Sequence, residues 1–215
     1  EAVRSMGLRP ADLATKLGSP FETANGVNPE ARLAALELPD SLVINRVIEV
    51  WHKVRKHAVI VLVFDKSGSM SGSKISAAIA GVTEFVTRMD LEDRLKWVPF
   101  DDKIYPGALG RKSELGEKLL SDISSTTAGG STALYDAVLG AVDTLEKVRA
   151  DLGDSVRYGI VVLSDGQDTN SRTSLVQLQA RLRPTEGDPT GIQIHTIAIG
   201  ADADESVLRK ISSSA

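Results

Sequence analysis

The spacing of apolar residues switches repeatedly between two periods along this chain, which predicts strands alternating with helices. Residues 58–64 read AVIVLVF, a continuous apolar run of strand length. Such a run is typical of a strand that is buried on both faces. The apolar residues that follow recur at steps of three and four, the spacing of one helical face: Ile75, Ile79, Val82, Val86 and Met89.

The same alternation continues toward the C-terminal end. We expect strands at 94–100, 158–163 and 192–199, with a short neighbouring strand at 103–109, and helices at 115–123, 134–148, 175–182 and 206–211. Strands that alternate with helices of this length form a mainly parallel sheet covered on both faces, and right-handed crossovers make it doubly wound. The sequence therefore predicts an α/β fold, a three-layer Rossmann-like sandwich.

The first 56 residues do not follow this pattern. Turn and loop signals crowd the stretch from Gly7 to Asn28. Asp40 or Ser41 can then cap a helix whose valines at 43, 47, 50 and 54 share one face. We therefore expect an N-terminal extension over residues 1–56 and one domain over residues 57–215. The chain opens at Glu1, without an initiator methionine, so we expect it to be a piece of a longer protein.

Composition narrows the possible functions. The 215 residues are 42% hydrophobic and 25% charged, as in ordinary soluble globular proteins, and the net charge is -4. No basic run is present, which argues against a nucleic-acid partner. No apolar run approaches the roughly 20 residues of a membrane span, so we expect no membrane contact from this segment. The absence of cysteine excludes disulfides and thiolate metal sites.

Small oxygen-bearing side chains gather in three loops that adjoin the predicted strands and helices. Asp65, Ser67 and Ser69 follow the first strand, Thr132 follows the pair Gly129-Gly130, and Asp165 ends the strand at 158–163. Gly68 gives the first loop freedom to turn tightly. Ligands bind at the carboxyl ends of the strands in doubly wound sheets. Carboxylate and hydroxyl oxygens, without sulfur or histidine, suit Mg²⁺, Mn²⁺ or Ca²⁺.

Taken together, these three loops resemble the metal-ion-dependent adhesion site of von Willebrand factor A-type domains, over about residues 57–213. The resemblance implies that Ser67 and Ser69 ligate the metal, most naturally Mg²⁺, and that Thr132 does so directly or through water. Asp65 and Asp165 would then bind mainly through waters. One open position would accept an Asp or Glu carboxylate of a partner protein, so the domain would be a binding module and not an enzyme.

The stretch before the domain resembles what precedes it in bacterial proteins that place it behind a solute-binding-like region. This second resemblance favours a larger bacterial protein and an extracytoplasmic or cell-surface location. Lys66 departs from the family pattern, because relatives often carry Thr or Val there. Lys66 could weaken metal binding or pair with a partner's acid.

Two other functions stay open at this point. The domain could be a structural scaffold that binds no metal. More remotely, Ser69, Asp165 and His195 occur in the chain order of an α/β-hydrolase triad. No G-x-S-x-G elbow is present, however, and His195 lies inside a strand pattern, which suits a structural histidine.

Several single residues have simpler interpretations. Ser and Thr residues before helices are good caps, Asp168 suits a turn, Asp136 complements a helix dipole, and Asp101-Asp102 suits a turn. Trp51 and Trp97 are expected to pack. The basic cluster Lys53, Arg55, Lys56 and His57 is expected to be a solvated helix end.

Overall fold

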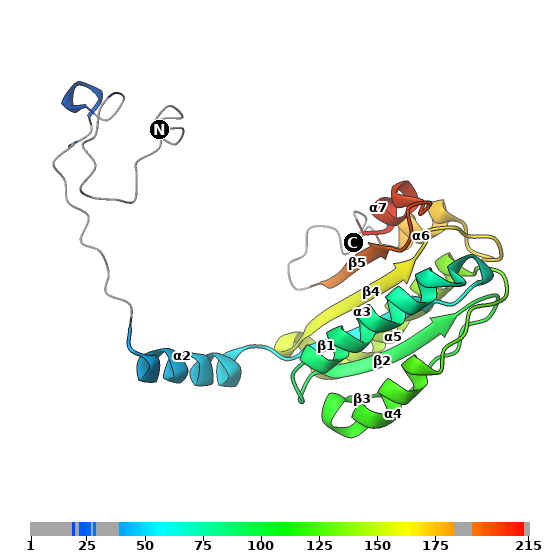
Figure 1. Ribbon diagram of the computed structural model, residues 1–215, viewed down its shortest axis with the longest axis horizontal. Helices are drawn as coiled ribbons and strands as arrows, with labels where there is room; N and C mark the ends of the chain where they lie inside the picture. Colours follow the sequence, from blue (N-terminus) through cyan, green and yellow to red (C-terminus); the bar gives the residue numbers. More distant parts are fainter. Residues whose placement is uncertain (1–18, 20–21, 27, 29–38, 183–190, 213–215) are drawn as a thin grey trace. The chain divides into compact units, whose positions relative to one another are not determined.

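The computed structural model describes residues 19, 22–26, 28, 39–182 and 191–212 and divides into two units, residues 1–54 and 55–215 (Figure 1). Most of the loop signals predicted between Gly7 and Asn28 lie outside the described residues. The first unit contains the short 3-10 helix η1 (Thr23–Asn25) and the helix α2 (Ser41–Val54). The division falls at 54/55, two residues before the boundary expected from the sequence.

Helix α2 begins where the sequence places it. Asp40 caps it, because its Oδ1 accepts the backbone N–H of Val43 at 2.8 Å. Its apolar residues are exposed, including Val47 and Trp51, and Trp51 is 64% exposed. A helix of this length has no core of its own to cover the indole, so the packing expected of Trp51 stays a prediction.

The second unit is built on a five-stranded sheet with the order β3-β2-β1-β4-β5. The strands are β1 (Ala58–Asp65), β2 (Arg94–Phe100), β3 (Leu109–Arg111), β4 (Arg157–Ser164) and β5 (Ile192–Ala198). All neighbours pair in parallel except β2 and β3, which pair antiparallel. The chain moves from β1 to β2 on one side and later to β4 on the other. The carboxyl ends of β1 and β4 therefore flank the topological switch point.

Helices cover the two faces of this sheet, as Figure 1 shows. On one face lie α3 (Ser73–Arg88) and α4 (Lys112–Ser124), and on the other lie α5 (Leu134–Leu152), α6 (Leu175–Leu182) and α7 (Glu205–Ser212). Strand β1 supplies both cores, because alternate side chains of a strand point to opposite faces. Val61 and Val63 pack toward α5, whereas Leu62 and Phe64 pack toward α3. The predicted doubly wound α/β fold is confirmed.

The expected strand at 103–109 is wrong in position. β3 begins only at Leu109, and earlier in that segment Ile104 makes a single antiparallel bridge to Phe100. Pro99 explains why β2 does not pair regularly there. Its carbonyl accepts the N–H of Tyr105 at 3.0 Å. In a strand, the N–H and C=O groups of one residue point to the same side. Pro99 has no N–H, so on the side that faces Tyr105 it offers only its carbonyl for pairing.

The expectation that the basic cluster Lys53, Arg55, Lys56 and His57 is a solvated helix end is wrong for Arg55. Arg55 lies 2.9 Å from an oxygen of Asp90 and 3.5 Å from Asp93, and the Arg55 side chain is only 20% exposed. Lys56 donates to the carbonyl of Asp154 at 2.5 Å. The local helix pattern could not indicate these partners, because they lie far from the cluster along the chain.

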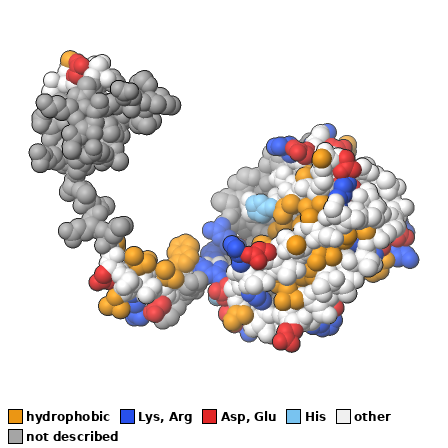
Figure 2. Space-filling model, viewed as in Figure 1, with side chains coloured by type: hydrophobic (Ala, Val, Ile, Leu, Met, Phe, Trp, Pro, Cys, Tyr) orange, Lys and Arg blue, Asp and Glu red, His pale blue; other side chains and the backbone are white. Residues whose placement is uncertain are grey.

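Strand β5, at one edge of the sheet, is buried on one face and largely exposed on the other. Ile192 and Ile194 of β5 are buried against the core that contains α5, whereas Gln193, His195 and Ile197 on the opposite face are exposed. Figure 2 views the face that carries α3 and shows hydrophobic side chains gathered between α3 and the β5 edge. His195 is thus a strand residue, as predicted, but its side chain is exposed and not part of the core.

Candidate metal centre

Asp65 is the last residue of β1 and is completely buried. Its Oδ1 accepts the backbone N–H of Ser67 at 2.9 Å, and its Oδ2 accepts the hydroxyl of Ser164 at 2.5 Å. Ser164 ends β4, so this second bond joins the two strand ends at the switch point. The Asp65 carboxylate thus fixes the start of the first predicted metal loop.

The two serines of that loop bring their hydroxyls together. Ser67 Oγ and Ser69 Oγ lie 3.1 Å apart, with Ser67 fully buried and Ser69 exposed. The 3-10 turn η2 (Gly68–Met70) begins directly after Ser67 and contains Ser69, which brings the two side chains together, and the buried Met70 anchors the turn in the core. The loop therefore presents two neutral oxygens at one point, with an approach from solvent.

Backbone hydrogen bonds join this loop to the second predicted loop. Gly68 donates to the carbonyl of Gly130 at 2.9 Å, and Gly129 donates to the carbonyl of Lys66 at 2.7 Å. Gly130 has φ +83°, and a Cβ there would lie 3.1 Å from Asp101 Cβ. Glycine is required at 130, whereas Gly68 is not in the left-handed region, so the tight-turn role expected of Gly68 is wrong.

Thr132 connects the second loop to the third. Its N–H donates to the hydroxyl of Thr169 at 3.0 Å, and its carbonyl accepts the N–H groups of Thr169 and Asn170 at 2.9 and 2.8 Å. The third loop begins at Asp165, which is fully buried. All three predicted loops therefore lie at the carboxyl end of the sheet, bonded in series.

Asp136 and Asp168 reinforce the third loop. Asp136, in the first turn of α5, accepts the N–H groups of Arg172 and Thr173 at 2.9 and 3.0 Å. Asp168 accepts the hydroxyl of Ser171 at 2.6 Å, as expected of a turn residue. Asp136 therefore does more than complement the helix dipole, because it fastens the loop to the helix.

The two buried carboxylates differ in their surroundings. Burial raises the pKa of Asp65, and its partners, the Ser67 N–H and the Ser164 hydroxyl, offset this only in part. Asp165 Oδ2 lies 3.4 Å from the ammonium of Lys74, which is also 2.8 Å from the carboxylate of Asp202. Among these contacts Asp65 has neutral partners, whereas Asp165 has a cationic one.

Lys66 does not stand free to meet a partner's acid. Its ammonium is ion-paired with Asp101 and lies 4.6 Å from the centre of the Tyr105 ring. Asp101 is 5% exposed and also accepts the N–H of Lys103 at 2.9 Å, so it closes the predicted turn as well. Burial raises the pKa of Asp101, but the Lys66 ammonium and these hydrogen bonds outweigh it and hold the pKa below its ordinary value.

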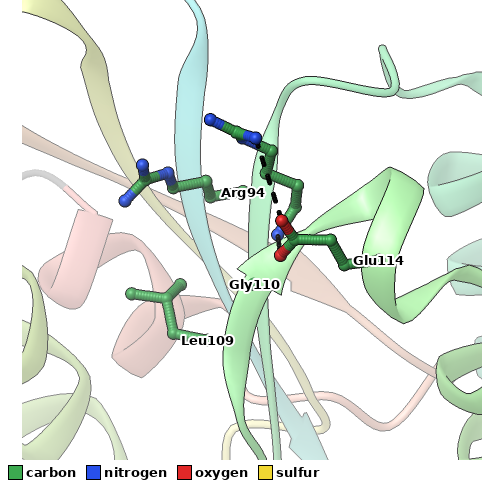
Figure 3. Close-up of a pocket in the computed structure, with 5 residues that line it drawn as sticks. Arg94, Leu109, Gly110 and Glu114 are labelled. Carbon is green, nitrogen blue, oxygen red and sulfur yellow. Dashed lines mark hydrogen bonds and ion pairs between the residues drawn. The ribbon is translucent and has the colours of Figure 1, made fainter.

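Two surface hollows lie near opposite ends of β2. A cavity of about 280 Å³ is lined by Arg94, Leu109, Gly110, Arg111 and Glu114 (Figure 3). Since Arg94 begins β2, this cavity is remote from the carboxyl end. A groove of about 590 Å³ includes Lys66, Ile104 and Tyr105 among its lining residues and adjoins the first metal loop. The second hollow is therefore the one beside the candidate centre.

Among the described residues, no three or more His, Cys, Asp or Glu side chains come close enough together to hold a metal ion. A cation at this centre would therefore depend on hydroxyl oxygens beside two carboxylates, the donor set that the sequence indicates. In the same part of the chain, no helix has the length and apolar character to cross a bilayer.

Comparison with known proteins identifies the class. The family model of the von Willebrand factor type A domain matches residues 60–215, so the chain belongs to this family. The inter-alpha-trypsin inhibitor heavy chain H4 of Sus scrofa is 28% identical over 168 residues, which cover 76% of this chain and 18% of that protein. The chain thus spans about a sixth of the length of the curated relatives that it matches first.

Solved structures show the same fold. A von Willebrand factor type A protein from Catenulispora acidiphila superposes with a TM-score of 0.61 at 20% identity, covering 74% of this chain and 37% of that one. The manganese-loaded TRAP protein of Plasmodium vivax has a TM-score of 0.58 at 18% identity, covering 73% and 62%. The family match confirms the predicted resemblance to von Willebrand factor A-type domains, and the solved structures confirm the fold.

Proposed function

We propose that this domain binds a divalent cation, most naturally Mg²⁺, through Ser67, Ser69 and Thr132, with Asp65 and Asp165 behind them, and that the cation recruits an acidic residue of a partner protein. The observation that carries the proposal is the paired Ser67 and Ser69 hydroxyls, 3.1 Å apart beside a buried carboxylate at the switch point. These are hard oxygen donors, the kind that Mg²⁺, Mn²⁺ and Ca²⁺ prefer.

Electrostatics also support the proposal. Asp65 is buried with neutral hydrogen-bond partners, and a buried carboxylate is costly without a compensating positive charge. A divalent cation supplies that charge. Because the serine and threonine ligands are neutral, the cation would keep charge to offer a partner's carboxylate. The manganese-loaded TRAP protein, which shares the fold, is a relative in which a divalent cation is present.

The effect of added metal on the unfolding temperature of the protein tests the proposal. We expect the chelator-stripped chain to unfold at a higher temperature when Mg²⁺ or Mn²⁺ is added. A cation at a hundredfold excess over its dissociation constant stabilises the native state by about 2.7 kcal/mol. Ser67→Ala and Thr132→Ala should reduce this gain, as measured by thermal unfolding with and without the metal.

The matched control is Ser76→Ala. Ser76 is an exposed serine in α3 whose hydroxyl donates to the carbonyl of Gly72, so the same atom is removed away from the centre. It should keep the full metal response. If wild type shows no response to millimolar metal, the cation-binding proposal is wrong and the scaffold function takes its place.

Selection from a random peptide library addresses the partner's chemistry. The immobilised domain is panned in Mg²⁺ and eluted with EDTA. We expect the eluted peptides to be enriched in Asp or Glu relative to those eluted from Ser67→Ala. Equal acid content from both proteins would reject the carboxylate mode while leaving metal binding intact.

A further inference from the structure

Lys74 lies beside the candidate metal centre without being one of its predicted ligands. It stands in the first turn of α3 with Nζ 3.4 Å from Asp165 Oδ2 and 2.8 Å from the carboxylate of Asp202. The Lys74 side chain is 17% exposed, and Asp202 is 66% exposed. The ammonium is therefore shared between a buried acid of the centre and a solvent-facing acid outside it.

The surrounding backbone is shaped to hold this lysine. Gly200, in the loop that follows β5, has φ +95°, and a Cβ there would lie 2.4 Å from Lys74 Cε. Any other residue would displace the methylene chain. The same loop supplies Asp202, and the N–H of Asp204 donates to the carbonyl of Asp165 at 2.7 Å. Lys74 is thus enclosed by a loop that is itself bonded to the centre.

Charge balance indicates what the lysine does. Asp165 is fully buried, and an unpaired buried carboxylate destabilises a fold. The hydrogen bond to Asp202, aided by the contacts with Asp165, raises the pKa of Lys74, so it stays protonated at neutral pH. A divalent cation near Asp165 would compensate the same negative charge and would be repelled by the ammonium.

We infer that Lys74 is an internal counter-cation that stabilises the metal-free fold and lowers the affinity of the centre for divalent cations, with Asp202 as the anchor that draws the ammonium away from Asp165. This inference rests on the proposed function. It assigns an affinity-determining role to a residue outside the predicted ligand set.

The two partners should have effects of opposite sign. Lys74→Met removes the competing charge, so the cation should bind more tightly, on the order of tenfold. The same variant should melt at a lower temperature than wild type in EDTA, because Asp165 loses its counter-charge. Asp202→Asn leaves the ammonium to Asp165, so the cation should bind more weakly. In a Lys74→Met background, Asp202→Asn should lose most of its effect.

Calorimetric titration of Mn²⁺ into the chelator-stripped chain measures these affinities. Lys103→Met is the matched control: Lys103 is an exposed lysine at the same end of the sheet, and its loss changes the net charge equally. Lys74→Gln replaces Lys74→Met if the latter does not fold. Tighter binding by the Lys74 variant than by both wild type and Lys103→Met supports the inference.

The outcomes separate the two proposals. If wild type binds Mn²⁺ and the Lys74 variant binds no more tightly, the inference is wrong and the proposed function stands. If only the Lys74 variant binds, the inference is supported in its strongest form, because the lysine then blocks the site. If neither protein binds Mn²⁺, both proposals are wrong.

Discussion

Asp65, one of the residues proposed to hold the cation, destabilises the metal-free fold because its carboxylate is buried. Burial raises its pKa above the ordinary value of about 3.9. The native state therefore holds the proton more tightly than the unfolded state does. Below the ordinary pKa both states are protonated and no penalty applies. As the pH rises through the folded-state pKa, the native state loses stability, and the loss persists at higher pH.

The loss of stability caused by the raised pKa of Asp65 gives a prediction for the metal-free protein. We expect Asp65→Asn to stabilise it relative to wild type above the folded-state pKa of Asp65, with the difference shrinking as the pH falls toward about 3.9. Urea unfolding of both proteins across that pH range, without metal, measures the difference. Comparing the pair is necessary because Asp101 and Asp136 have lowered pKa values and contribute the opposite slope. A pH-independent difference would contradict the assignment.

The ion pair between Lys66 and Asp101 leads to a second prediction about single residues. Lys66→Met would leave Asp101, which is buried, without its cationic partner. Removing one partner of a buried polar group costs about 1–3 kcal/mol, so we expect a loss of this size in urea unfolding. The exposed Lys103→Met should cost much less. Adding Asp101→Asn to Lys66→Met should cost less than the sum of the single changes, since the two residues interact.

The residues that sequence reasoning found and missed differ in a physical way. Asp65, Ser67 and Ser69 lie within one short loop, so their spacing alone suggests that they converge. Lys74 and Asp101 act through ion pairs with residues distant along the chain, and no local spacing encodes such a pair. Lys66 was noticed as an unusual cation, yet its partner could be found only from the folded chain.

Elements were predictable where their pattern was long and periodic. The helices around Val82 and Val138 and the strand β1 follow directly from their apolar spacing. β3 was placed too early, because its three residues carry too little pattern and Pro99 redirects the preceding segment. The predicted parallel sheet still placed the three loops at one end, which is why the candidate centre was accessible to reasoning from sequence.

The link between α5 and the loop after β4 yields a prediction at the scale of elements. Asp136→Ala removes the acceptor for two backbone N–H groups of that loop. Hydrogen bonds to charged groups are worth about 1.5–3 kcal/mol each, so we expect faster limited proteolysis near Arg172 and a weaker metal response. Asp151→Ala, an exposed site near the other end of α5, is the control. Equal cleavage rates in the two variants would refute this role of Asp136.

At the scale of the whole molecule, the question is where the domain begins. The sequence predicts 57, whereas the described structure divides the chain at 54/55. Arg55 accounts for the difference, because it pairs with Asp90 and with Asp93, and Asp93 also accepts the N–H of Ala58, the first residue of β1. Because Arg55 neutralises two acids of the domain, it contributes to the stability of the domain and is part of it.

The chain starting at Arg55 should therefore fold by itself with a cooperative transition. Arg55→Met in that shortened chain should cost about 1–3 kcal/mol, because Asp93 is buried and would lose its guanidinium partner. Arg46→Met in the full chain is the comparison. Arg46 lies on α2, and its ion pair among the described residues is a local, exposed one with Glu49, so the change should leave the stability unchanged. Thermal and urea unfolding measure both effects. An Arg55→Met variant as stable as its parent would place the start of the domain after Arg55, as the apolar pattern of the sequence suggests.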